Sequence, residues 1–221
     1  MRSSRMRSCV LAACLLALLA GAAHALAGEP VEAAEKEVSL RWALGALRTE
    51  GAEPSGIKQD TQLEGGARLK FLVEPLSPGS VYLILLDSEG NAQVLYRQAS
   101  RRLEGAGAEP TYIPPGREWF ELDDHKGTET FFLLASTEPL APLESLLDSL
   151  RADGADRKRV STEIVEEVRR LHKEHRRFAR PVEKPVMIGG LTRGAQSASI
   201  DHLAVEISAE RFYGKTITID H

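Results

Sequence analysis

Three pairs of adjacent aspartate and histidine residues carry side chains suited to acid–base or metal chemistry: Asp124-His125, Asp201-His202 and Asp220-His221. A histidine next to a carboxylate can transfer protons, and a cluster of such residues can bind zinc or copper. Neighbouring residues of a strand, however, point to opposite faces of a sheet, so the aspartate of each pair cannot orient its histidine. We therefore predict no catalytic residue, metal site or cofactor here. The alternative is a small hydrolase or metal-dependent enzyme in which His202 and His221 approach each other.

His172 and His175 stand three residues apart in a segment with helical periodicity, a spacing that can place two imidazoles on one metal ion. The zinc motif H-E-x-x-H requires a spacing of four and a glutamate directly after the first histidine, and this segment has neither. His175 falls on the same helical face as Ile164 and Val168. The phase of that apolar face favours a histidine packed in the core over a metal ligand.

The same segment is strongly basic. Residues 157–180 contain nine lysines and arginines against four acidic residues, a local charge of +5. The acids lie mostly in the early turns and the bases in the late ones, a distribution that the helix dipole alone favours, so an ordinary solvated face is one interpretation. The other is a docking surface for an envelope protein or an anionic lipid surface. Its candidate partner-binding residues are Arg169, Arg170, Lys173, Arg176 and Arg177.

The first 27 residues have the pattern of a secretory signal peptide. Three arginines precede an apolar run over residues 9–20, and small residues end at Ala25-Leu26-Ala27. This pattern predicts cleavage after Ala27 and export to the periplasm or the cell exterior. A retained anchor is one alternative. A lipoprotein acylated at Cys14 is another, but it would leave an apolar core of only five residues before that cysteine.

Cleavage at this position would change the composition in a way that excludes several functions. The whole chain has 221 residues with 28 lysines and arginines against 32 acids, and its two cysteines lie in the first 27 residues. The remaining 194 residues would carry a formal charge of −7 and no cysteine. Disulfides, cysteine nucleophiles and cysteine-ligated metals are then excluded, and the net acidity argues against nucleic-acid binding. The remainder has no apolar run near 18 residues, so no transmembrane segment is expected in it.

Hydrophobic periodicity predicts the order of the structural elements. Residues 28–37 are an acidic leader that we expect to be flexible. Residues 38–140 alternate between strand-like segments and turns, typical of a β-sandwich. In this part we predict hairpins over residues 81–97 and over residues 119–122 with 128–136. Residues 141–180 have helical periodicity, with Ser161 as the expected N-cap of the second helix.

The end of the chain returns to strand-like alternation over residues 181–221, where we expect strands that complete the same domain. The predicted fold is mainly β with α. It is a β-sandwich, immunoglobulin-like in general architecture, with a two-helix insertion and C-terminal strands.

Turn and strand residues between positions 63 and 140 have a recognisable spacing. They include Gly65-Gly66, Asp87-Ser88-Glu89-Gly90, Tyr112-Ile113-Pro114 and Gly127-Thr128-Glu129. In these residues the chain resembles the bacterial family of domains of unknown function numbered 4384. It departs from that family at Leu95-Tyr96-Arg97, where members often have Phe-Pro. The resemblance implies an exported, β-rich accessory domain and carries over no active site.

Taken together, these features predict a non-catalytic accessory or protein-binding module of the bacterial envelope. The enzyme with Asp-His pairs is one alternative, and a self-associating structural component of the envelope is another. Tight stoichiometric binding of zinc would favour the first alternative, and self-association without a foreign partner would favour the second.

Overall fold

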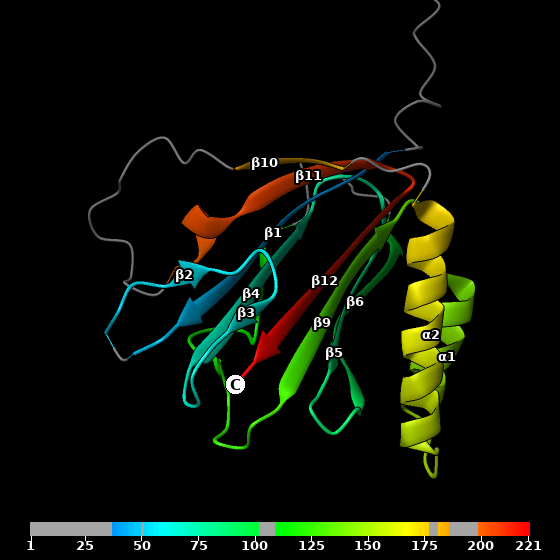
Figure 1. Ribbon diagram of the computed structural model, residues 1–221. Helices are drawn as coiled ribbons and strands as arrows, with labels where there is room; N and C mark the ends of the chain where they lie inside the picture. The colour runs from blue at the N-terminus through cyan, green and yellow to red at the C-terminus, as the bar shows by residue number, and fades with distance from the viewer. Residues whose placement is uncertain (1–36, 50, 102–108, 177–180, 186–198) are drawn as a thin grey trace, which may run out of the picture. The chain divides into compact units, whose positions relative to one another are not determined.

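The computed structural model describes residues 37–49, 51–101, 109–176, 181–185 and 199–221. The predicted signal peptide with Cys14, most of the acidic leader, and Arg177 lie outside the described residues. In the described part the chain is mainly β, with two sheets and two α-helices (Figure 1). The predicted fold class, a mainly β sandwich with two helices, is confirmed.

The two sheets contain the following strands. In the first, the hydrogen-bonded order is β10 (Val182–Pro185), β11 (Val205–Glu210), β1 (Glu37–Leu47), β4 (Arg68–Pro75) and β7 (Thr111–Ile113), with β2 (Ser55–Gly56) beside β1 and β8 (Phe120–Glu121) beside β4. In the second, the order is β3 (Thr61–Gln62), β12 (Phe212–Asp220), β9 (Thr128–Ser136), β5 (Gly79–Leu86) and β6 (Ala92–Arg101).

The main core lies between the two sheets because each long strand presents an apolar face at every second residue. Leu40 and Trp42 of β1 meet Leu83 of β5 and Leu133 of β9 in one buried cluster, and each of these side chains is at most 2% exposed. β5 lies inside the second sheet, between β6 and β9.

The C-terminal strands join both sheets. β11 pairs antiparallel with β1, placing Val205 opposite Trp42, and β12 pairs antiparallel with β9, placing Ile217 opposite Phe131. The last segment of the chain therefore closes the core that the N-terminal strands begin. It also places β12 next to the helices.

The helices α1 (Ala141–Ser149) and α2 (Arg157–His175) cover the outer face of the second sheet (Figure 1). Their apolar residues, among them Leu143 and Ile164, pack on Tyr82, Ile84 and Leu134 of that face in a second buried cluster. The sheet thus has helices on one side and the other sheet on its opposite side. Among the described residues, neither helix combines the length and apolarity needed to cross a membrane.

The prediction of a hairpin over residues 119–122 and 128–136 is wrong. Phe120 pairs with Leu69 of β4 in the first sheet, whereas β9 belongs to the second sheet. The backbone of Leu122 exchanges hydrogen bonds with Gly66 and Ala67, which keeps this segment beside β4. The turn between the two segments is therefore a crossover between sheets, which residue periodicity cannot distinguish from a hairpin.

The predicted start of the second helix is also wrong. The N-cap of α2 is Asp156, five residues before the expected Ser161, and its side chain accepts a hydrogen bond from the Arg159 amide at 3.1 Å. Ser161 lies inside the helix and is fully buried. Its hydroxyl accepts a hydrogen bond from the Ala92 amide at 2.8 Å, which ties α2 to the start of β6.

A candidate functional site between α2 and the second sheet

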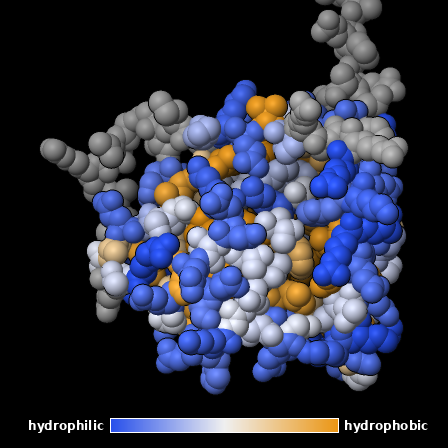
Figure 2. Space-filling view, in the orientation of Figure 1, coloured by the Kyte–Doolittle hydropathy of each residue, from blue (hydrophilic) through white to orange (hydrophobic). Residues whose placement is uncertain are grey.

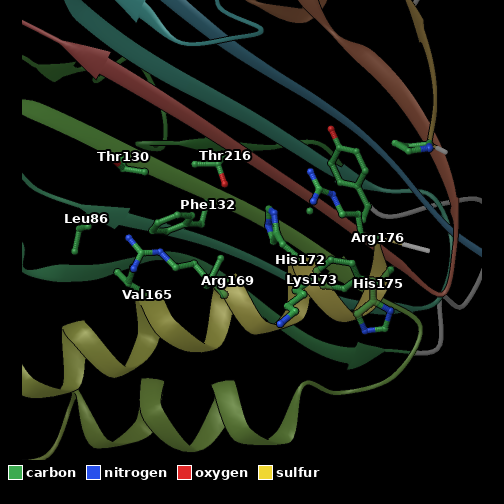
Figure 3. Close-up of a pocket in the computed structure, with 15 residues that line it drawn as sticks. Leu86, Thr130, Phe132, Val165, Arg169, His172, Lys173, His175, Arg176 and Thr216 are labelled. Atoms are coloured by element: carbon green, nitrogen blue, oxygen red, sulfur yellow. The ribbon is translucent and has the colours of Figure 1, made fainter. Parts of the chain in front are cut away.

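A groove of about 730 Å³ runs between the C-terminal half of α2 and the outer faces of β9 and β12. Its helix wall carries cationic and imidazole side chains, and its sheet wall carries aromatic rings and threonine hydroxyls (Figure 3). We call it the α2 groove, and it is lined by Leu86, Thr130, Phe132, Val165, Val168, Arg169, His172, Lys173, His175, Arg176, Pro181, Phe212, Tyr213, Gly214 and Thr216.

Three cations form a row along the helix wall. Arg169, Lys173 and Arg176 are separated by four and three residues, so they share one face of α2. All three are exposed and line the groove. None of the described residues that line the groove is acidic, and no described carboxylate forms an ion pair with any of the three. We call these three residues the basic row.

Arg170, the fourth predicted partner-binding residue in the described part, points away from the groove. Its guanidinium group donates hydrogen bonds to both oxygens of Glu167 at 2.7 Å and also pairs with Glu174. These carboxylates raise the pKa of Arg170. The guanidinium group therefore stays positively charged, and the two carboxylates balance its charge. The structure thus divides the predicted set: Arg169, Lys173 and Arg176 lie together, Arg170 lies apart, and Arg177 is outside the described residues.

The sheet wall is apolar at its base. Alternate residues of a strand share a face, so Phe212, Gly214 and Thr216 of β12 point outward beside Phe132 of β9. His175 stacks on Phe212, with ring centroids 4.4 Å apart and an interplanar angle of 21°. Figure 2 shows hydrophobic side chains between the strongly hydrophilic ones over α2 and the paler ones over β12. A ligand in the groove would therefore contact positive charge on one side and apolar surface on the other.

His172 lies at the centre of the groove and points toward the sheet (Figure 3). Its Nε2 atom is buried and has no hydrogen-bond partner among the described residues. Burial lowers the pKa of His172, which favours the neutral imidazole. The ring fits there because residue 214 is a glycine: a Cβ atom at Gly214 would stand 2.7 Å from Nε2.

Tyr213 adds no negative charge to the groove. Burial is the main reason that its pKa is raised, and the nearby carboxylate of Glu183 raises it further. The phenol therefore stays neutral at ordinary pH. Glu183 itself lies 3.6 Å from the ammonium group of Lys215.

The three Asp-His pairs lie outside the lining of this groove. The backbones of His221 and Gly127 exchange hydrogen bonds at 3.0 Å, so the Asp220-His221 pair lies beside the turn that carries Asp124-His125. The His125 side chain is 92% exposed in the turn before β9, and His202 is exposed in a short 3-10 helix, η2 (Asp201–Leu203), beside the first sheet. His221 directly follows β12, and its Nε2 atom lies 3.4 Å from a carboxylate oxygen of Glu129. Among the described residues no three histidine, cysteine or acidic side chains are grouped closely enough to hold a metal ion.

The sequence interpretation found the basic row but missed the other half of the groove. Phe132, Phe212 and Thr216 come from strands that are about 80 residues apart in sequence, and only their pairing brings them under α2. The available signal was the alternation in β12, which assigns Thr216 to the face opposite Ile217.

No protein-family model, no curated protein and no solved structure matches this chain. The resemblance of residues 63–140 to the family numbered 4384 therefore stays a prediction.

Proposed function

We propose that this protein is an exported, non-catalytic accessory module of the bacterial envelope that binds an anionic partner protein through the α2 groove. The observation that carries the proposal is the basic row, whose three charges have no described carboxylate partner and stand over an apolar floor. The predicted signal peptide supports the location.

The arrangement is suited to electrostatic capture. Outside the groove, the arginines of the described surface are frequently paired: Arg41 with Glu74, Arg97 with Asp148, and Arg159 with Glu163. A cluster of charges of the same sign, in a partly enclosed site of low dielectric constant, attracts an oppositely charged partner and fixes its orientation. The aromatic floor then supplies the buried contact that gives such an interface most of its affinity.

Capture from the native envelope tests this proposal. Tagged mature protein would be compared with a groove variant carrying Arg169→Gln, Lys173→Gln and Arg176→Gln. A control variant with Arg48→Gln, Lys58→Gln and Lys126→Gln removes the same charge at exposed positions outside the groove.

We expect a single acidic protein to be crosslinked by the native and control proteins and lost from the groove variant. Equal recovery by all three proteins would show that the groove does not bind the partner. Recovery of no protein by any of them would also contradict the proposal.

A further inference from the structure

We infer that the occupant of the α2 groove is an extended peptide segment of the partner, with acidic residues at alternate positions and apolar residues between them. This inference rests on the proposed function and specifies the chemistry of its ligand. It follows from the length of the basic row and from the contrast between the two walls of the groove.

The basic row is too long to serve a single anionic group. Arg169 and Arg176 are seven residues apart, which separates their backbones by about 10 Å along the helix axis. In Figure 3 the side chain of Arg169 extends along Phe132, whereas that of Arg176 lies near His172. The two guanidinium groups therefore do not converge on one carboxylate or phosphate. They suit a ligand with several charges in a line.

An extended peptide has such a line of charges. Residues on one face of a strand recur every 6.4 to 6.8 Å or so, and three alternate carboxylates therefore span roughly 13 Å. The flexible side chains of the basic row can match that spacing. The residues between the acids point the opposite way, toward Phe132 and Phe212 on the sheet wall. A peptide in which acidic and apolar residues alternate would thus place its acidic side chains on the basic helix wall and its apolar side chains on the sheet wall.

A lipid surface fits the geometry less well. Cations that bind a membrane project outward from a convex face, where they reach a plane of headgroups. Here Arg169, His172 and Arg176 lie between the helix and the sheet (Figure 3). The structure therefore favours a peptide, and membrane binding becomes an outcome of the test.

Binding of synthetic peptides to the mature protein tests the inference by fluorescence anisotropy. The first probe is a labelled nonapeptide in which glutamate and valine alternate. The second has the same composition but groups its glutamates and valines in two blocks, and the third replaces glutamate with lysine. Vesicles that contain an anionic phospholipid form a separate arm.

We expect the alternating acidic peptide to bind at least tenfold more tightly than the block peptide, with affinity falling as salt screens the basic row. The groove variant should weaken binding at least tenfold and the control variant less than twofold. A second pair of variants tests shape at constant charge. Thr216→Tyr fills the groove and should weaken binding, whereas Thr218→Tyr lies two residues along the same face, outside the groove lining, and should not.

Equal binding of the alternating and block peptides would overturn the inference, and so would tighter binding to vesicles than to any peptide. If no peptide binds while the groove variant still loses its envelope partner, the extended-peptide ligand is wrong and the proposed function stands. If the envelope partner is also retained by the groove variant, both are wrong.

Discussion

The hydrogen bond between Ser161 and Ala92 joins α2 to β6, and we can predict how much stability is lost when it is removed. Ser161 is 0% exposed, and its Oγ atom accepts the Ala92 amide at 2.8 Å while its hydroxyl donates to the Arg157 carbonyl at 2.7 Å. In a Ser161→Ala variant the Ala92 amide is left buried without this acceptor. An orphaned buried amide costs about 1 to 3 kcal/mol.

The replacement also has a favourable effect, because alanine is a better helix former than serine by about 0.5 kcal/mol. We therefore expect a net loss of about 0.5 to 2.5 kcal/mol in the free energy of unfolding. For a chain of this size the melting temperature would fall by about 2 to 4 °C per kcal/mol. Urea unfolding followed by circular dichroism measures the loss.

Thr162→Ala is the matched control. Thr162 is the next residue of α2, is exposed, and makes the same kind of bond to the carbonyl four residues earlier, but it has no bond to β6. Its replacement should change stability by less than about 0.5 kcal/mol. Amide hydrogen exchange gives a second measurement, since the Ala92 amide should lose protection in Ser161→Ala only. Equal stability losses in the two variants, with unchanged exchange at Ala92, would refute the argument.

Two further predictions concern buried ionisable groups. Because burial lowers the pKa of His172 in the folded state, the unfolded chain binds its proton first, and stability should fall as pH drops below the ordinary histidine value near 6.5. His172→Gln should flatten the unfolding free energy against pH in this window, and the exposed control His125→Gln should leave the slope unchanged. The Lys70 side chain is only 4% exposed, and its ammonium group donates to the carbonyls of Gly116 at 2.8 Å and Glu118 at 2.7 Å. Lys70→Met should therefore destabilise the fold by about 1 to 2 kcal/mol in urea, and an unchanged midpoint would contradict this role.

The sequence was sufficient to predict those parts of the fold that depend on local periodicity. The alternation in β1 and β4, and the apolar face of α2, each follow from which side chains must be buried. The crossover after Phe120 could not be predicted in this way. Its direction depends on which strand the segment joins, and Leu69 is about 50 residues away in sequence. The buried role of Ser161 was hidden for a similar reason, because its partner lies on another element.

For the candidate site, too, the sequence predicts the features that depend on nearby residues but not those that depend on contacts between distant ones. The helical spacing of Arg169, Lys173 and Arg176 predicts one cationic face, because residues three and four apart lie together on a helix. The sequence does not indicate which of the bases are neutralised. That depends on Glu167 and Glu174, which share the Arg170 side of the helix. The floor of the groove required the pairing of β12 with β9.

The fold separates the charges of α2 into two faces with different consequences. On one face Arg170 pairs with the buried carboxylate of Glu167 and with the exposed one of Glu174. The exposed pair contributes little to stability, because water already solvates both partners. On the other face the basic row lines a groove with aromatic rings and the half-buried imidazole of His172, whose Nε2 atom is shielded from water. Repulsion among the like charges of the basic row opposes folding and is reduced when an anion binds there. An anionic segment bound in the groove should therefore raise the free energy of unfolding, and the increase should grow with the logarithm of its concentration once that exceeds the dissociation constant.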